Sequence, residues 1–175
     1  PPVHLVGLHL HGTVEMEGSE LRVSGGAWRD AGGPGVEEGG GLRVSGGVAT
    51  VVNSTFDDCR AKRGGAIAVK HGTLQMAASS LRSNVADEKG GGLFVAAGTV
   101  VLSDGTLLAD NIAPVGATVQ LEGGSLTYAL PTSLGRWVAS AFECKPYRLP
   151  CPPGGDGSCN PDAQPLLDAQ PCDYA

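Results

Sequence analysis

Apolar and polar residues alternate in short runs over most of residues 7–128, and none of these runs has a helical period. From residue 39 onward, each Gly-containing turn is followed by a run in which every second residue is apolar. The last apolar residue of this run recurs at Val44, Val69, Val95 and Leu121, a spacing of about 26 residues. Period-two alternation predicts half-buried β-strands, and the constant spacing predicts a repeat architecture.

Each unit continues with a second alternating pair of apolar residues and then a third apolar position. The second pairs are Ala49/Val51, Leu74/Met76, Val100/Leu102 and Leu126/Tyr128, and the third positions are Phe56, Leu81 and Leu107. An earlier unit is expected to supply Leu8 and Leu10, then Val14 and Met16, then Leu21. The residues from Trp28 to Gly35 are interpreted as a loop inserted before the next unit.

One such unit cannot bury its own apolar face, but stacked units place like residues over one another and enclose an apolar core. The predicted fold is therefore all-β: a right-handed parallel β-helix with three strands in each coil of about 26 residues. The solenoid is expected to span residues 1–128, with coils beginning near residues 7, 39, 64, 90 and 116.

A second repeated feature follows the third apolar position of each unit. Cys59, Asn84 and Asn111 occupy this place in three successive units. Small polar side chains stacked in register can hydrogen-bond along a column, and Asn tolerates left-handed backbone. We therefore expect a ladder of Cys59, Asn84 and Asn111 at one corner, with Cys59 as a small buried thiol.

Two of these motifs resemble a known family. Gly64-Gly65-Ala66-Ile67 and Leu81-Arg82-Ser83-Asn84 are similar to the GGAI and FxxN repeats of the chlamydial polymorphic outer membrane proteins, which also occur in secreted proteins of algae and other protists. The resemblance covers residues 39–128, with residues 7–38 as a degenerate copy. It implies a right-handed β-helix displayed at a surface and used for adhesion. Cys59 departs from the pattern by replacing one Asn, and Leu replaces Phe in two coils.

Residues 129–175 differ in character from the repeat. Pro and Cys are concentrated there, and the four cysteines are Cys144, Cys151, Cys159 and Cys172. Without a CxxC pair or a nearby His, two disulfides are favoured over a zinc site, and three connectivities are open. We expect an irregular disulfide-rich cap or linker, in which the apolar segment 137–142 covers the open end of the solenoid.

The charge balance restricts the partners. The net charge is −6 and the basic residues form no dense run, which argues against nucleic acid. No apolar stretch is long enough for a transmembrane helix. Asn53-Ser54-Thr55 is an N-glycosylation sequon in the turn between two predicted strands. Together with the disulfides, it favours an extracellular or cell-surface location.

These observations predict a structural or adhesive module of a larger surface, matrix or filament protein. Its expected partners are other subunits, further domains of the same chain, and glycans. The alternative is a polysaccharide-binding or lyase-like β-helix that uses the charged turns near Asp57 and Asp87. Trp28 and Phe94 are the aromatic residues expected to face outward for such binding. His9 and His11 lack a third ligand, so no metal site is expected. The sequence has no nucleophile elbow, phosphate-binding loop or dinucleotide fingerprint, so no catalytic residue or cofactor is expected.

Overall fold

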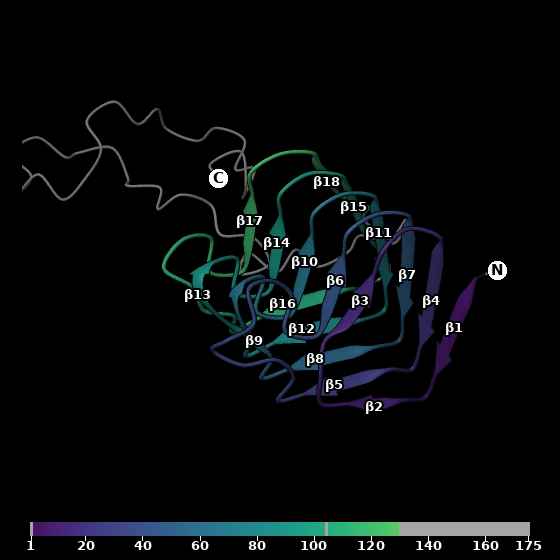
Figure 1. Cartoon of the computed structure of the whole chain (residues 1–175), viewed down its shortest axis with the longest axis horizontal. Helices are drawn as coiled ribbons and strands as arrows, with labels where there is room; N and C mark the ends of the chain where they lie inside the picture. Colours follow the sequence, from purple (N-terminus) through teal and green to yellow (C-terminus); the bar gives the residue numbers. More distant parts are fainter. Residues whose placement is uncertain (1, 104, 130–175) are drawn as a thin grey trace, which may run out of the picture.

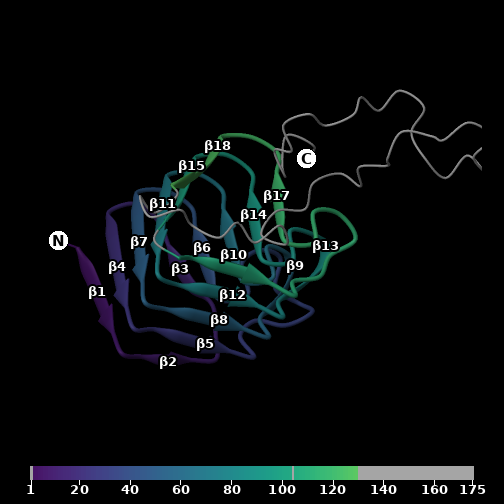
Figure 2. The ribbon, with the colours of Figure 1, turned by 180° about the vertical axis from the view of Figure 1, so that it is seen from behind.

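The computed structural model describes residues 2–103 and 105–129, which form an all-β solenoid of about four turns (Figure 1). The described residues contain no helix, and therefore none that could cross a membrane. Every strand pairing is parallel and joins a strand to its counterpart in a neighbouring coil. The same arrangement is visible from behind, where the coils stack from the N-terminal end to β18 (Figure 2).

Three long sheets form the walls of the solenoid. Sheet A contains β1 (Val3–Val6), β4 (Glu20–Ser24), β7 (Val48–Val52), β11 (Thr73–Ala77), β15 (Thr99–Ser103) and β18 (Ser125–Ala129). Sheet B contains β2 (His9–Leu10), β5 (Ala27–Arg29), β8 (Thr55–Asp57), β12 (Ser80–Arg82) and β16 (Leu107–Ala109). Sheet C contains β3 (Val14–Met16), β6 (Leu42–Val44), β10 (Ile67–Val69), β14 (Leu93–Val95) and β17 (Val119–Leu121).

A fourth, shorter side lies between sheets B and C. Its sheet D contains β9 (Arg60–Arg63) and β13 (Val85–Lys89), whose pairing has an irregularity between Ala86 and Lys89. Single bridges extend this side to Glu38 in one direction and to Val115 in the other. From the sequence these segments are expected to be turns, because their charged residues hide the alternation of a strand; the structure shows them as strands.

The register explains the repeat length. Thr73 pairs with Val48 on one side and Thr99 on the other, so consecutive coils are offset by 25 and 26 residues. The corner before sheet C is so close-packed that a Cβ on Gly65 would lie 2.3 Å from the carbonyl oxygen of Gly91. A glycine is therefore required there by the next coil, and the sequence repeats it at Gly40 and Gly91, where a Cβ would be equally close to a carbonyl oxygen of the next coil.

The predicted alignment of the first unit was wrong by one strand. Val14 and Met16 pair with Leu42 and Val44, so they belong to sheet C. They had been aligned with the second apolar pair of each unit, which lies in sheet A. The structure places Leu21 opposite Ala49 instead. The error arose because three short alternating runs of similar length follow one another there, and each fits the template equally well.

Trp28 and Leu107 also lie elsewhere than predicted. Trp28 is on β5, pairs with Phe56 and is fully buried, so it is a core residue and not part of an inserted loop. The long connection of this coil begins after β5 instead. At the third apolar position of the last full coil, Leu108 pairs with Leu81 and is fully buried, whereas Leu107 points outward. An extra residue in the preceding turn shifts the alternation by one.

The core is a narrow column of apolar side chains from sheets A, B and C. Its largest fully buried members include Trp28, Phe56, Leu42, Ile67, Leu74, Leu81, Leu93, Leu102 and Leu108. Each contacts residues of the same coil and of the neighbouring coils, so the apolar face of each unit is covered only because the units stack. The predicted cap, with Cys144, Cys151, Cys159 and Cys172, lies outside the described residues.

Candidate functional site

Cys59, Asn84 and Asn111 lie in one column at the corner between sheets B and D. Asn84 is fully buried, and its Oδ1 accepts a hydrogen bond of 2.9 Å from the backbone N–H of Cys59. Its Nδ2 donates to Asn111 Oδ1 at 2.8 Å and to the carbonyl oxygen of Phe56 at 3.0 Å. Asn111 Nδ2 in turn donates to the Leu81 carbonyl at 3.1 Å. The amides thus join three consecutive coils inside the solenoid.

Cys59 is a free, fully buried cysteine in this column. Its Sγ lies 3.6 Å from the carbonyl oxygen of Asp57. Burial in the corner, together with the nearby aspartates, raises the pKa of the thiol to about 12. Because the thiolate is the reactive form of cysteine, this residue is poorly suited to nucleophilic chemistry in the folded protein.

A second inner column, at the corner between sheets A and B, was not found by the sequence analysis. It consists of the buried hydroxyl residues Ser54, Ser79 and Thr106. Ser54 Oγ accepts from the N–H of Gly26, and Ser79 Oγ accepts from the N–H of Ser54, both at 3.1 Å. Two Ser and one Thr in Ser-rich turns give a weak signal. The recurring position two residues before each sheet-B core residue is the pattern that would have revealed them.

Asn53 occupies the tight turn beside this column. Its backbone has a positive φ of 48°, and its side chain is exposed. Ser54, the middle residue of the sequon, is buried in the hydroxyl column, and Thr55 begins β8. The turn therefore presents the Asn53 amide to solvent, while the remainder of the sequon is held by the sheet.

The charged residues proposed for polysaccharide chemistry do not converge. Asp57 ends β8 on sheet B, opposite Arg29 and Arg82 in the neighbouring strands. Asp58 is exposed in the turn that follows. Asp87 lies on β13 of sheet D and forms an ion pair of 2.6 Å with Arg60. Acid and base are therefore paired across coils on one side, and Asp57 belongs to another wall.

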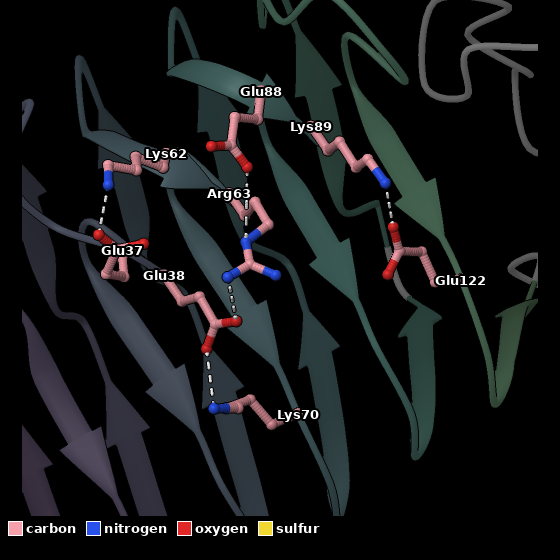
Figure 3. A network of polar contacts seen from close by, with 8 residues as sticks. All are labelled: Glu37, Glu38, Lys62, Arg63, Lys70, Glu88, Lys89 and Glu122. Carbon is pink, nitrogen blue, oxygen red and sulfur yellow. Dashed lines mark hydrogen bonds and ion pairs between the residues drawn. The ribbon is translucent and has the colours of Figure 1, made fainter.

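Most of the remaining ion pairs lie on the side formed by sheet D and the adjoining part of sheet C, here called the charged side (Figure 3). At its centre the carboxylate of Glu38, with 6% of its side chain exposed, lies 3.3 Å from Arg63 and 3.3 Å from Lys70. Arg63 also lies 3.8 Å from Glu88 of the next coil. The charges along this side alternate in sign from coil to coil.

Two exposed ion pairs flank this centre. Lys62 pairs with Glu37, and Lys89 pairs with Glu122 (Figure 3). The hydrogen bond from Lys62 lowers the pKa of Glu37, and the same bond raises the pKa of Lys62. Because both groups are in solvent, these shifts indicate a local attraction and little contribution to stability.

Neither aromatic residue expected on the outside is available to stack on a sugar. Trp28 is in the core, with its ring 4.3 Å from that of Phe56 and almost parallel to it. Phe94 does lie on the outward side of β14, but it is fully buried. The guanidinium carbon of Arg63 lies 5.7 Å from the centre of the Phe94 ring and covers it. The expectation of an outward side chain was wrong for Trp28, whereas Phe94 does face outward but is covered by Arg63.

Within residues 2–103 and 105–129, no three His, Cys, Asp or Glu side chains are grouped so that they could hold a metal ion. The polar groups described above bind one another, and they do so mainly from one coil to the next. Their chemistry is that of hydrogen bonding and ion pairing between stacked turns.

Comparisons with protein-family models, with curated proteins and with solved structures each found no match.

Proposed function

We propose that this chain is a structural or adhesive extracellular module of a larger surface or matrix protein, built as a right-handed parallel β-helix with three long walls and a shorter fourth side. Its role is to hold coils in a stiff stack and to present flat walls and turns to other protein subunits, further domains of the same chain, or glycans. The walls, corners and ion pairs repeat with the coil, as a scaffold requires.

The observation that carries the proposal is the use of polar side chains. The buried Asn84, Asn111, Ser54 and Ser79 all bond to an adjacent coil. The pairs Arg43–Glu15, Arg60–Asp87 and Lys62–Glu37 likewise join residues that are 25–28 positions apart. An active site would need some of these groups to converge on a substrate, whereas a scaffold uses them to lock its own turns together.

The first experiment separates this role from polysaccharide cleavage. Beads coated with the full chain are tested for adhesion to one another and to extracellular matrix, and uronate polysaccharides are tested for unsaturated products. The triple variant Asp57→Asn, Asp58→Asn, Asp87→Asn should keep adhesion and fold, and neither protein should release product. Product formation that disappears in the triple variant would overturn the proposal in favour of a lyase.

The second experiment addresses location. Peptide mass spectrometry of native protein under non-reducing conditions should find two bridges among Cys144, Cys151, Cys159 and Cys172, with Cys59 free and a glycan on Asn53. Five reduced thiols and an unmodified Asn53 would contradict an extracellular role. Asn53 provides its own control, because Thr55→Ala removes the sequon and leaves the exposed amide in place.

A further inference from the structure

One wall of the solenoid differs from the others in its outer surface. The outward side chains of β7, β11, β15 and β18, here called the neutral face, are uncharged at every position whose side chain the structure describes. They are Val48, Thr50, Val52, Thr73, Gln75, Ala77, Thr99, Val101, Ser103, Ser125 and Thr127. The charged side, by contrast, carries an acid or a base on each coil. Another protein surface can therefore cover the neutral face without burying an unpaired charge.

The neutral face is also regular. Its strands are each five residues long and pair in register without a bulge. They lie side by side along one wall in both views (Figures 1 and 2). The outward residues consequently form straight rows: Thr73 beside Thr99 in one, Gln75 beside Val101 in the next, and Ala77 beside Ser103 in the third. A flat, ordered surface of small β-branched and hydroxyl side chains suits packing against another sheet.

We propose that the neutral face binds the neutral face of a second copy of this chain, with the two solenoids antiparallel about a two-fold axis. The axis lies parallel to the strands, between β11 and β15. This inference rests on the proposed structural role, and it identifies a second copy of the chain as the partner subunit. In this arrangement β11 faces β15 of the second copy, so Gln75 lies over the second copy's Val101, and Thr73 lies over its Thr99.

Charge selects this arrangement over the parallel one. β4, the next strand of the same wall, carries Glu20 and Arg22, which pair with each other on its outer surface. If the solenoids were parallel, each coil would face itself and Arg22 would oppose the second copy's Arg22. In the antiparallel arrangement β4 lies beyond the four-strand contact, and both charges remain in water.

The size of the face sets the strength of the contact. Four strands about 4.8 Å apart and five residues long, at about 3.3 Å per residue, cover roughly 300 Å² in the plane of the sheet. This is less than the roughly 800 Å² per partner of a standard interface, even when the relief of the side chains is included. The pair is therefore weak, with a dissociation constant on the order of 0.1 mM. It serves where many copies are held close together.

The test is sedimentation equilibrium of the full chain from about 10 µM to 1 mM, a range that brackets a weak contact. A non-reducing gel identifies covalent dimers, which are excluded from the measurement. The wild-type chain should show a concentration-dependent dimer. Val101→Lys should weaken it about tenfold or more, because a lysine would be buried against Gln75 of the second copy. Ser80→Lys, on the outer wall of sheet B, is the matched control and should leave the dimer unchanged.

A compensating variant tests the geometry. Gln75→Glu combined with Val101→Lys places opposite charges over one another only in the antiparallel pair, so association should return. In the parallel pair like charges would meet, and a double variant that stays monomeric would overturn the arrangement. A wild-type chain that is monomeric throughout would overturn the pairing itself. That result would leave the adhesion assay and the proposed scaffold role standing.

Discussion

The inner corner columns and the charged side both join consecutive coils, but they do so in different surroundings. Asn84 and Ser79 are neutral and buried, whereas the side chains of Lys62 and Glu37 are 38% and 58% exposed. The sequence separation between partners is similar in both regions. The comparison teaches that the repeat determines which residues interact, whereas burial determines how much each interaction contributes to stability. A lost partner is replaced by water on the outside but leaves an unsatisfied group in the interior.

The largest effect should come from Asn84→Ala. This change removes the acceptor of the Cys59 N–H and the donor to the Phe56 carbonyl, and both groups are buried. We expect the free energy of unfolding to fall by about 3 kcal/mol or more, measured by urea denaturation followed by circular dichroism. Arg82→Ala, on the exposed face of β12, should change it by less than about 0.5 kcal/mol. Equal effects of the two variants would erase the distinction between interior and exterior.

The next effect depends on pH and involves Cys59. The folded thiol keeps its proton up to a pKa of about 12, whereas in the unfolded chain it ionises near 9.0. Stability is therefore fully present below pH 9 and falls as the pH rises toward 12, because only the unfolded state loses the proton. Between pH 8.5 and 10.5 the loss should be about 2 kcal/mol. Cys59→Ala should lack this part of the slope, so parallel curves for the two proteins would contradict the buried thiol.

A smaller loss is expected from Ser79→Ala in the hydroxyl column. The change removes the acceptor of the Ser54 N–H at 3.1 Å and the donor to the Ala77 carbonyl at 2.8 Å. The expected decrease in the free energy of unfolding is about 1–2 kcal/mol in the same urea experiment. Ser80→Ala, one residue along, is the control, because Ser80 lies on the outer wall. If Ser80→Ala were the more damaging, the hydroxyl column would not be a stabilising element.

The smallest effects should come from the charged side. Its adjacent residues Glu37 and Glu38 differ in burial, so they test whether burial governs the effect. Glu38→Gln leaves Arg63 and Lys70 without their nearly buried carboxylate, and stability should fall by about 1 kcal/mol, since both cations still reach water. Glu37→Gln should cause no measurable change. When the urea denaturation of both variants is repeated at high salt, the free energy of unfolding of Glu37→Gln should still equal that of the wild-type chain. A larger loss from Glu37→Gln than from Glu38→Gln would show that burial does not govern this side.

The sequence was sufficient for the parallel solenoid and for the register of sheets A and C from β6 onward. In that part of the chain the glycine turns are regular, and the alternation has only one reading. It was insufficient in the first unit, because Val14, Met16 and Leu21 fit the template equally well one strand later than the strand each of them occupies. Leu107 and Leu108 show the same limit on a smaller scale. One extra residue in the turn before β16 changes which residues of that strand face the core.

The inner and outer polar groups differ in the same way. The column of Cys59, Asn84 and Asn111 could be predicted, since amides at a fixed position have few roles in a repeat. Ser54 and Ser79 could not be separated from ordinary turn residues, because serine is common there whether buried or exposed. The burial of Phe94 depends on Arg63 from the preceding coil reaching across it. No spacing rule predicts where such a long, flexible side chain will lie.

Each strand of residues 2–103 and 105–129 pairs only with its counterparts in adjacent coils, so this part of the chain is a one-dimensional array of nearest neighbours. Thr73 begins one coil and Thr99 begins the next, and Gly72 and Gly98 precede them at the same corner. Deletion of residues 73–98 would therefore join Gly72 to Thr99 at two equivalent corners. Each remaining strand would then pair with the equivalent strand of the adjacent coil, as it does now. A solenoid of this kind can be lengthened or shortened by whole coils when the gene segment that encodes one coil is duplicated or deleted. The length of the solenoid can therefore change in evolution while the structure of each coil is kept.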